Sequence, residues 1–119
     1  MTNSIVANLE KLLGGPRDGA LLRYSLGVEW AKSGASDKAA RYFREALAFD
    51  RNYSAAWKQL GKALSDQGQP VEALAAYREG VSVATAKGDL QAAKEMTVFA
   101  KRIARQLGEN PESGGQITS

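Results

Sequence analysis

The 119-residue sequence contains no cysteine and no histidine. Without thiolates or imidazoles, the chain can form no disulfide, no zinc site built on cysteine or histidine, and no catalytic triad that depends on histidine. The two common phosphate-binding patterns, G-x-x-x-x-G-K-[ST] and G-x-G-x-x-G, do not occur either. The sequence therefore predicts that the protein is not an enzyme and uses no cofactor.

Strong charge of one sign is also lacking, because 16 Lys plus Arg face 13 Asp plus Glu and leave a formal net charge of +3. This small excess makes nucleic acid an improbable partner. The first residues, MTNSIVANLEKLLGG, include no Lys or Arg before the apolar positions and no long apolar run. They resemble neither a secretory signal nor a membrane span, so we expect a cytoplasmic protein.

What the sequence does contain is an internal repeat with a period of 34 residues. Shifting the chain by one period aligns Leu26-Gly27 with Leu60-Gly61, and Gly34 with Gly68. The aligned residues are mostly small residues, glycines and large apolar residues, which are the types needed where helices touch or end. Further identities in the same register pair Ala39 with Ala73, Arg44 with Arg78 and Glu45 with Glu79.

Each repeat unit has the pattern of two helices joined by a short turn. Apolar residues recur at steps of three and four, which predicts one buried face on each helix, with Trp30 and Trp57 on that face. Glycines follow the apolar periods and predict helix ends at Gly14, Gly34, Gly68, Gly88 and Gly108. Residues able to cap helix starts are Asp18, Ser36, Asn52 or Ser54, and Asp89.

These signals divide the chain into one domain, residues 1–107, and a tail. Within the domain we expect an amino-terminal helix over 4–13, repeat units over 20–53 and 54–87, and a capping helix over 89–107. Residues 108–119 contain too few apolar residues to order a chain, so we expect them to be disordered.

The repeat units resemble the tetratricopeptide repeat (TPR). The second unit supplies the pattern of that family with Trp57, Leu60-Gly61, Leu64, Ala73, Tyr77 and Gly80, and the first with Leu26-Gly27, Trp30, Ala39, Phe43 and Ala46. The sequence departs from the pattern where Arg23 replaces a large apolar residue and where Arg51 and Thr85 replace proline. The whole layout is similar to small free-standing bacterial proteins of this class.

The resemblance implies an all-α fold, a TPR-like right-handed solenoid of helical hairpins with two repeats, an amino-terminal helix and a carboxy-terminal capping helix. It also implies a concave groove that binds a peptide, and hence an adaptor or scaffold role. The ligand suggested by an apolar patch beside lysines is an acidic peptide with one apolar anchor. The groove positions implied by the family are Leu21, Tyr24, Val28, Lys32, Ala55, Lys58, Lys62 and Asp66, extended by Lys94 and Lys101 on the last helix.

Two other functions stay open at this stage. The basic side of the last helix, with Lys94, Lys101, Arg102 and Arg105, would suit weak binding to nucleic acid or an anionic surface. Self-association is the other alternative, so the chain is expected to be a monomer or a weak homodimer. The clamp by which some relatives bind terminal carboxylates is absent, because Tyr24, Val28 and Gln59 occupy its positions.

Overall fold

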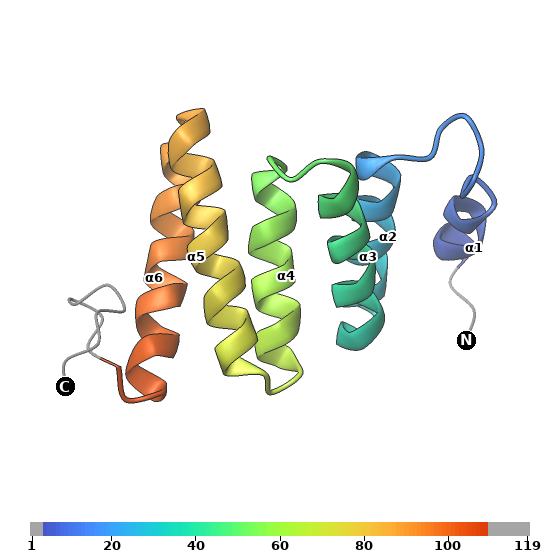
Figure 1. Ribbon diagram of the computed structural model, residues 1–119. Helices are drawn as coiled ribbons and strands as arrows, with labels where there is room; N and C mark the ends of the chain where they lie inside the picture. Colours follow the sequence, from blue (N-terminus) through green and yellow to red (C-terminus); the bar gives the residue numbers. More distant parts are fainter. Residues whose placement is uncertain (1–3, 110–119) are drawn as a thin grey trace.

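The computed structural model describes residues 4–109, which form six α-helices and no β-strand. Figure 1 shows the helices side by side in chain order, and α2 to α6 alternate in direction. This arrangement confirms the predicted all-α stack of helical hairpins. The helices are α1 (Ser4–Glu10), α2 (Ala20–Lys32), α3 (Ser36–Phe49), α4 (Ser54–Asp66), α5 (Pro70–Lys87) and α6 (Leu90–Gln106).

The stack has two layers. Helices α2, α4 and α6 form one layer, in which α4 contacts both α2 and α6. Helices α3 and α5 form the other layer, and each of them contacts α4. No pair of Cα atoms within 8 Å joins α3 to α5 directly. A gap therefore separates the backbones of α3 and α5, and α4 lies under this gap.

Glycines allow the two helices of each hairpin to approach closely. A Cβ atom on Gly27 would lie 2.5 Å from Cε1 of Phe43, and one on Gly61 would lie 2.7 Å from Cε1 of Tyr77. These separations are shorter than any real Cβ contact, so only glycine fits at either position. The two equivalent contacts explain why Leu-Gly and an aromatic residue recur at the period of 34 residues.

Both tryptophans lie on the apolar face of their helices, but they are buried to different degrees. Trp57 is 9% exposed and belongs to the main core, together with the fully buried Phe43 and Met96. Trp30 is partly buried and contacts both the main core and a smaller cluster of Val6, Leu22, Leu26 and Tyr42. Trp30 thus connects the repeats to the amino-terminal helix.

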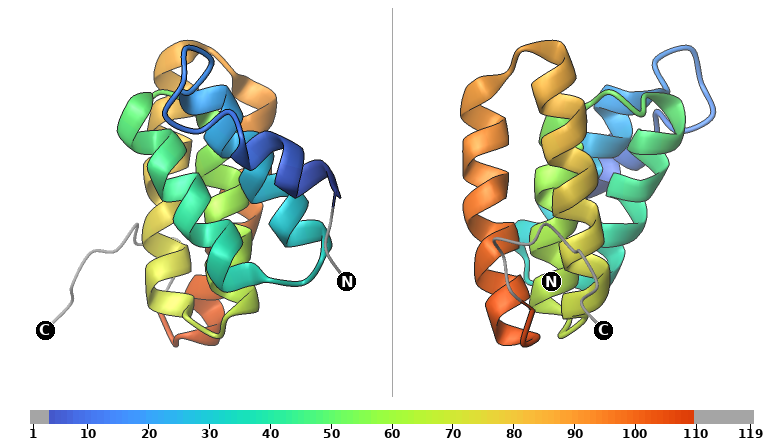
Figure 2. Two further views of the ribbon diagram at one scale, coloured as in Figure 1. Left: turned by 90° about the vertical axis from the view of Figure 1, so that its right-hand side faces the viewer. Right: turned by 60° about the vertical axis from the view of Figure 1, so that its left-hand side comes forward.

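Helix α1 is shorter than the predicted helix over 4–13. The N–H groups of Leu12 and Leu13 bond to carbonyls three residues earlier, so the chain tightens into turns after Glu10. Leu12 and Leu13 still pack against the small cluster, as Leu9 of α1 does. Figure 2 shows α1 lying across the end of the stack, beside α2.

The helix ends are predicted better than the helix starts. All five glycines that were expected to end helices have positive φ angles, which L-amino acids with a Cβ rarely adopt. Of the expected caps, only Asp89 accepts a hydrogen bond from its helix, at the N–H of Ala92. Asp18 instead accepts from the N–H of Gly14 and from the side chain of Arg23.

Arg23, which occupies a position usually held by a large apolar residue, lies in an ion-pair network. Its guanidinium is 2.7 Å from Asp18 Oδ2 and 2.6 Å from Glu45 Oε1. The hydrogen bonds from Arg23 and from the Gly14 N–H hold the pKa of Asp18 well below its usual range. Charge pairing thus replaces apolar packing where α2 begins.

Of the predicted disordered tail, only Gly108 and Glu109 are among the described residues. The Glu109 N–H bonds to the Ala104 carbonyl, and its carboxylate pairs with Arg78 at 3.1 Å. These two residues therefore continue the end of α6 just past the predicted domain boundary at residue 107. Residues 110–119 lie outside the described part of the chain.

Candidate binding surface

The predicted groove residues of α2 and α4 lie on two neighbouring helices of one layer. We call the exposed side of the α2, α4 and α6 layer the inner surface. On α2, Leu21 is 69% exposed, whereas Tyr24 and Val28 are partly buried against the core. On α4, Ala55 is also partly buried, and Asp66 is exposed. The inner surface thus has apolar residues at one end of the two helices and charged residues at the other.

An aromatic pair forms the apolar part of the inner surface. The ring of Tyr24 stacks on that of Tyr53 with centroids 4.8 Å apart and planes 27° apart. It also tilts against the buried Phe43 at 5.7 Å. Burial raises the pKa of Tyr53. Tyr53 was not predicted from the sequence, because this residue lies in the turn before α4, where helical periodicity gives no signal.

Every lysine that was predicted on α2 or α4 is paired with a carboxylate. Lys58 Nζ lies 2.6 Å from Glu95 Oε1 of α6, and Lys62 Nζ lies 2.9 Å from Asp66 Oδ2. Lys32 pairs with Glu29 in the same way, at 3.1 Å. The surface that was expected to be basic is therefore a row of neutralised pairs.

Glu95 is a further residue of the inner surface that was not predicted from the sequence. The ammonium group of Lys58, followed by the amide of Gln91, lowers the pKa of this carboxyl below its usual value. Helix α6 does not match the repeat pattern, so the period of 34 residues could not align Glu95 with a groove position.

The two predicted residues on α6 lie apart from the others. A helix turns by about 100° per residue, so Lys94 and Lys101 are about 100° and 120° around the axis from Glu95. Between these lysines and Glu95 the helix surface carries the exposed residues Val98 and Arg102, so the lysines lie on the side of α6 away from Lys58. The structure therefore brings Glu95, rather than Lys94 or Lys101, to the inner surface.

A small pocket lies between the ends of α2 and α4, with a cavity volume of about 160 Å³. This volume is below the range of about 300–1,000 Å³ that is typical of sites for small molecules. Its lining combines small residues with the Lys62 pair and consists of Ala31, Gly34, Ser36, Gln59, Lys62, Ala63 and Asp66.

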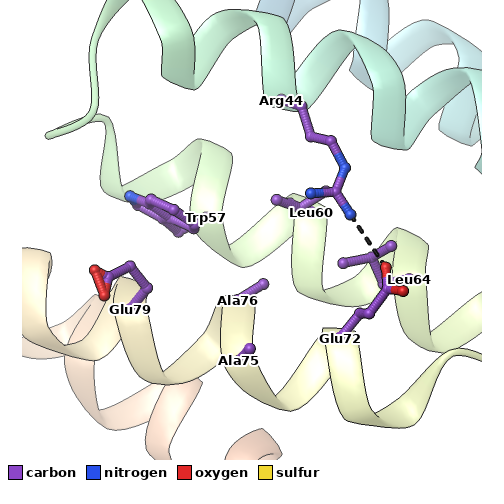
Figure 3. A pocket seen from close by; sticks show the side chains of 8 residues that line it. All are labelled: Arg44, Trp57, Leu60, Leu64, Glu72, Ala75, Ala76 and Glu79. Atoms are coloured by element: carbon purple, nitrogen blue, oxygen red, sulfur yellow. Dashed lines mark hydrogen bonds and ion pairs between the residues drawn. The ribbon is translucent and has the colours of Figure 1, made fainter.

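A larger depression lies in the opposite layer, between α3 and α5, and has a cavity volume of about 420 Å³. We call it the outer groove. Figure 3 shows that its floor comes from α4 and its two sides from α3 and α5. The lining residues are Arg44, Trp57, Leu60, Leu64, Glu72, Ala75, Ala76 and Glu79.

Residues 4–109 contain no candidate metal site and no candidate membrane span. No group of three or more acidic side chains is arranged to hold a metal ion there. None of the helices in this range has both the length and the apolar character required to cross a bilayer.

No protein-family model matches the chain. The TPR repeat-containing protein PA0015 of Pseudomonas aeruginosa is 40% identical over 101 residues, which are 85% of this chain and 96% of that protein. The solution structure of protein BPP2914 from Bordetella parapertussis has a TM-score of 0.76 and 41% identity over 88% of this chain and 91% of that chain. A tetratricopeptide repeat domain protein from Salinibacter ruber has a TM-score of 0.67 and 25% identity, over 74% of this chain and 88% of that chain.

Proposed function

Because the chain belongs to the tetratricopeptide repeat family, we propose that it is a non-catalytic interaction module that binds a peptide segment of a partner protein on its inner surface. We propose the cytoplasm as its location, where it would act as an adaptor or scaffold.

The observation that carries this proposal is the aromatic pair on the inner surface. Tyr24 and Tyr53 are stacked and partly exposed, and Tyr24 also packs against the buried Phe43. A rigid aromatic platform of this kind can contribute binding energy at little cost in side-chain entropy. Val28 lies one turn further along α2 and also packs against the core. We therefore propose that an apolar side chain of the partner sits against Tyr24, Tyr53 and Val28.

The ion pairs beside this platform provide the polar part of the proposed site. The side chains of Lys58 and Glu95 are 38% and 40% exposed, and exposed pairs contribute little to stability. An acidic residue of the partner can therefore replace Glu95 as the acceptor of Lys58 at small cost. In this proposal an acidic peptide binds by exchange of ion-pair partners rather than by meeting free lysines.

A matched pair of charge-reversal variants tests the location of the site. Lys58→Glu with Lys62→Glu changes the inner surface, whereas Lys94→Glu with Lys101→Glu makes the same charge change on the other side of α6. Affinity capture from a bacterial lysate, followed by mass spectrometry and by direct titration of each captured protein, compares both variants with wild type. Circular dichroism confirms that each variant keeps its helix content.

We expect the inner-surface variant to lose a partner that the α6 variant retains. Equal binding by wild type and the inner-surface variant would contradict the proposed site. Loss of binding only in the α6 variant, with a steep dependence on salt, would instead support an anionic partner on the last helix.

A further inference from the structure

The outer groove is a preformed cavity that no side chain of the described residues fills. Its volume of about 420 Å³ lies within the range that is typical of binding pockets. The cavity is wide because no Cα atoms of α3 and α5 lie within 8 Å of each other, and because the α5 side carries only the small residues Ala75 and Ala76 at its centre. Space of this kind in an otherwise close-packed stack can receive one large apolar side chain.

The floor of the outer groove is apolar and rigid. Leu60 and Leu64 are each 2% exposed and are packed in the main core beneath the cavity. Trp57 is fixed by a hydrogen bond of 2.8 Å from its Nε1–H to the carbonyl of Arg51. The guanidinium of Arg51 also lies over the Trp57 ring, 5.4 Å from the centroid. A side chain that enters the groove would therefore meet a surface that needs no rearrangement.

Opposite charges line the two rims of the outer groove. Arg44 lies on α3 and Arg51 in the turn that follows this helix, whereas Glu72 and Glu79 are seven residues apart on α5. Two ion pairs cross the groove, of which the Arg44–Glu72 pair is drawn in Figure 3 at 3.3 Å and the Arg51–Glu79 pair measures 2.7 Å. On α5, seven residues are about two helical turns, or about 10.5 Å, so the two crossings leave an opening between them.

These rim pairs can open for a ligand. Their side chains are between 39% and 67% exposed, and ion pairs exposed to this extent contribute little to stability. Each arginine can donate hydrogen bonds to a carboxylate of a partner, and each glutamate can accept hydrogen bonds from an ammonium or guanidinium group. The rims therefore complement a partner that carries acidic residues on one side and basic residues on the other.

From these observations we propose that the outer groove binds an amphipathic helix of a partner protein. One bulky apolar side chain of that helix enters the cavity above Leu60 and Ala76. Acidic residues spaced by about two turns face Arg44 and Arg51, and basic residues with the same spacing face Glu72 and Glu79. The site lies in the layer opposite the inner surface, so the inference does not depend on the function proposed above.

A synthetic peptide provides a direct test. The probe is a 15-residue, hydrocarbon-stapled helix with one central leucine, two glutamates spaced by seven residues on one side and two lysines with the same spacing on the other. It is titrated into ¹⁵N-labelled protein while the amide signals and the Trp57 indole N–H are followed. We expect saturable shifts at Trp57, Ala75 and Ala76, without matching shifts at Tyr24 and Lys58.

Two control peptides test the chemistry of the partner. Replacing the central leucine by glutamine should abolish saturable binding, and replacing both lysines by glutamate should weaken it at least about tenfold, since the acidic rim then repels the peptide. Equal binding of the doubly acidic peptide, saturable shifts confined to the inner surface, or no saturable shift for the original peptide would each overturn the proposal.

A variant of the protein tests the cavity itself. Ala75 is exposed, so Ala75→Leu should fold normally and fill the opening from the α5 side. It should reduce affinity for the probe at least about tenfold. Ala86→Leu makes the same change at another exposed position of α5 outside the groove and should bind as wild type does. Unchanged affinity in a folded Ala75→Leu protein would overturn the proposed site.

Discussion

Lys58 Nζ donates a hydrogen bond of 2.6 Å to Glu95 Oε1, and this ion pair links α4 to α6 across the inner surface. The pair has two consequences. It neutralises the lysine that was expected to attract an acidic ligand, and it lowers the pKa of the glutamate below its ordinary value of about 4.5.

The lowered pKa of Glu95 predicts a specific dependence of stability on pH. The unfolded chain binds a proton at Glu95 near pH 4.5 and the folded chain binds it only at lower pH, so the stabilisation is present above pH 4.5 and is lost as the pH falls through the folded-state pKa. Glu95→Gln should therefore be less stable than wild type at pH 7, with a difference that shrinks as the pH falls below 4.5. Urea denaturation at several pH values measures this. A difference that stays constant with pH would contradict the assigned ion pair.

The close contact between α4 and α5 predicts a cost for adding one methyl group. Gly61→Ala improves helix propensity by about 1 kcal/mol but places a Cβ 2.7 Å from the Tyr77 ring, so we expect a net loss of about 1–3 kcal/mol. Gly19→Ala serves as the control, because nothing lies within 4 Å of its Cβ and its backbone is extended. Thermal and urea unfolding compare the two. If the two substitutions had equal effects, the hairpin packing described above would be wrong.

Tyr77 should make the protein sensitive to alkali. Burial raises the pKa of Tyr77 to about 12 from its ordinary value of 10.0. Stabilisation is therefore complete below pH 10 and is lost as the pH rises towards 12, because the unfolded chain releases this proton first. Wild type should lose on the order of 1–3 kcal/mol more than Tyr77→Phe over this interval. Denaturation between about pH 8 and 12 provides the measurement, and parallel losses in both proteins would count against the burial of the hydroxyl.

Two neighbouring alanines of α5 test the register of the second repeat. Ala73 is 0% exposed and lies in the core, whereas Ala75 is exposed. Ala73→Glu would bury a charge and should cost about 4 kcal/mol or more, or prevent folding. Ala75→Glu should change stability by only about 0.5 kcal/mol or less. Circular dichroism with thermal melting separates the two. A stable, fully helical Ala73→Glu protein would show that the faces of α5 have been assigned incorrectly.

The sequence predicts the hairpins well because their signals are local. Gly61 and Tyr77 meet within one hairpin and recur, as Gly27 and Phe43, after one period, so a single alignment of the chain with itself reveals the contact. Positive φ at Gly68 likewise depends only on the end of one helix. Both features follow from helix geometry alone.

Contacts between repeats were harder to predict. Arg44 and Glu72 are 28 residues apart, a spacing that the period of 34 does not indicate, and their pairing depends on the offset between α3 and α5. The Lys58–Glu95 pair depends in the same way on the position of α6, which departs from the repeat pattern. Such offsets arise from packing of whole helices, so the charge of the proposed site could not be read from single helices.

The neighbour-to-neighbour pattern of contacts also bears on how fast the chain folds. Within residues 4–109, each helix contacts only helices one or two places away along the chain. Few long loops must therefore close before favourable contacts form, and topologies of this kind fold quickly. Either hairpin can form first and act as the template on which the next helix docks, so folding has more than one accessible starting point.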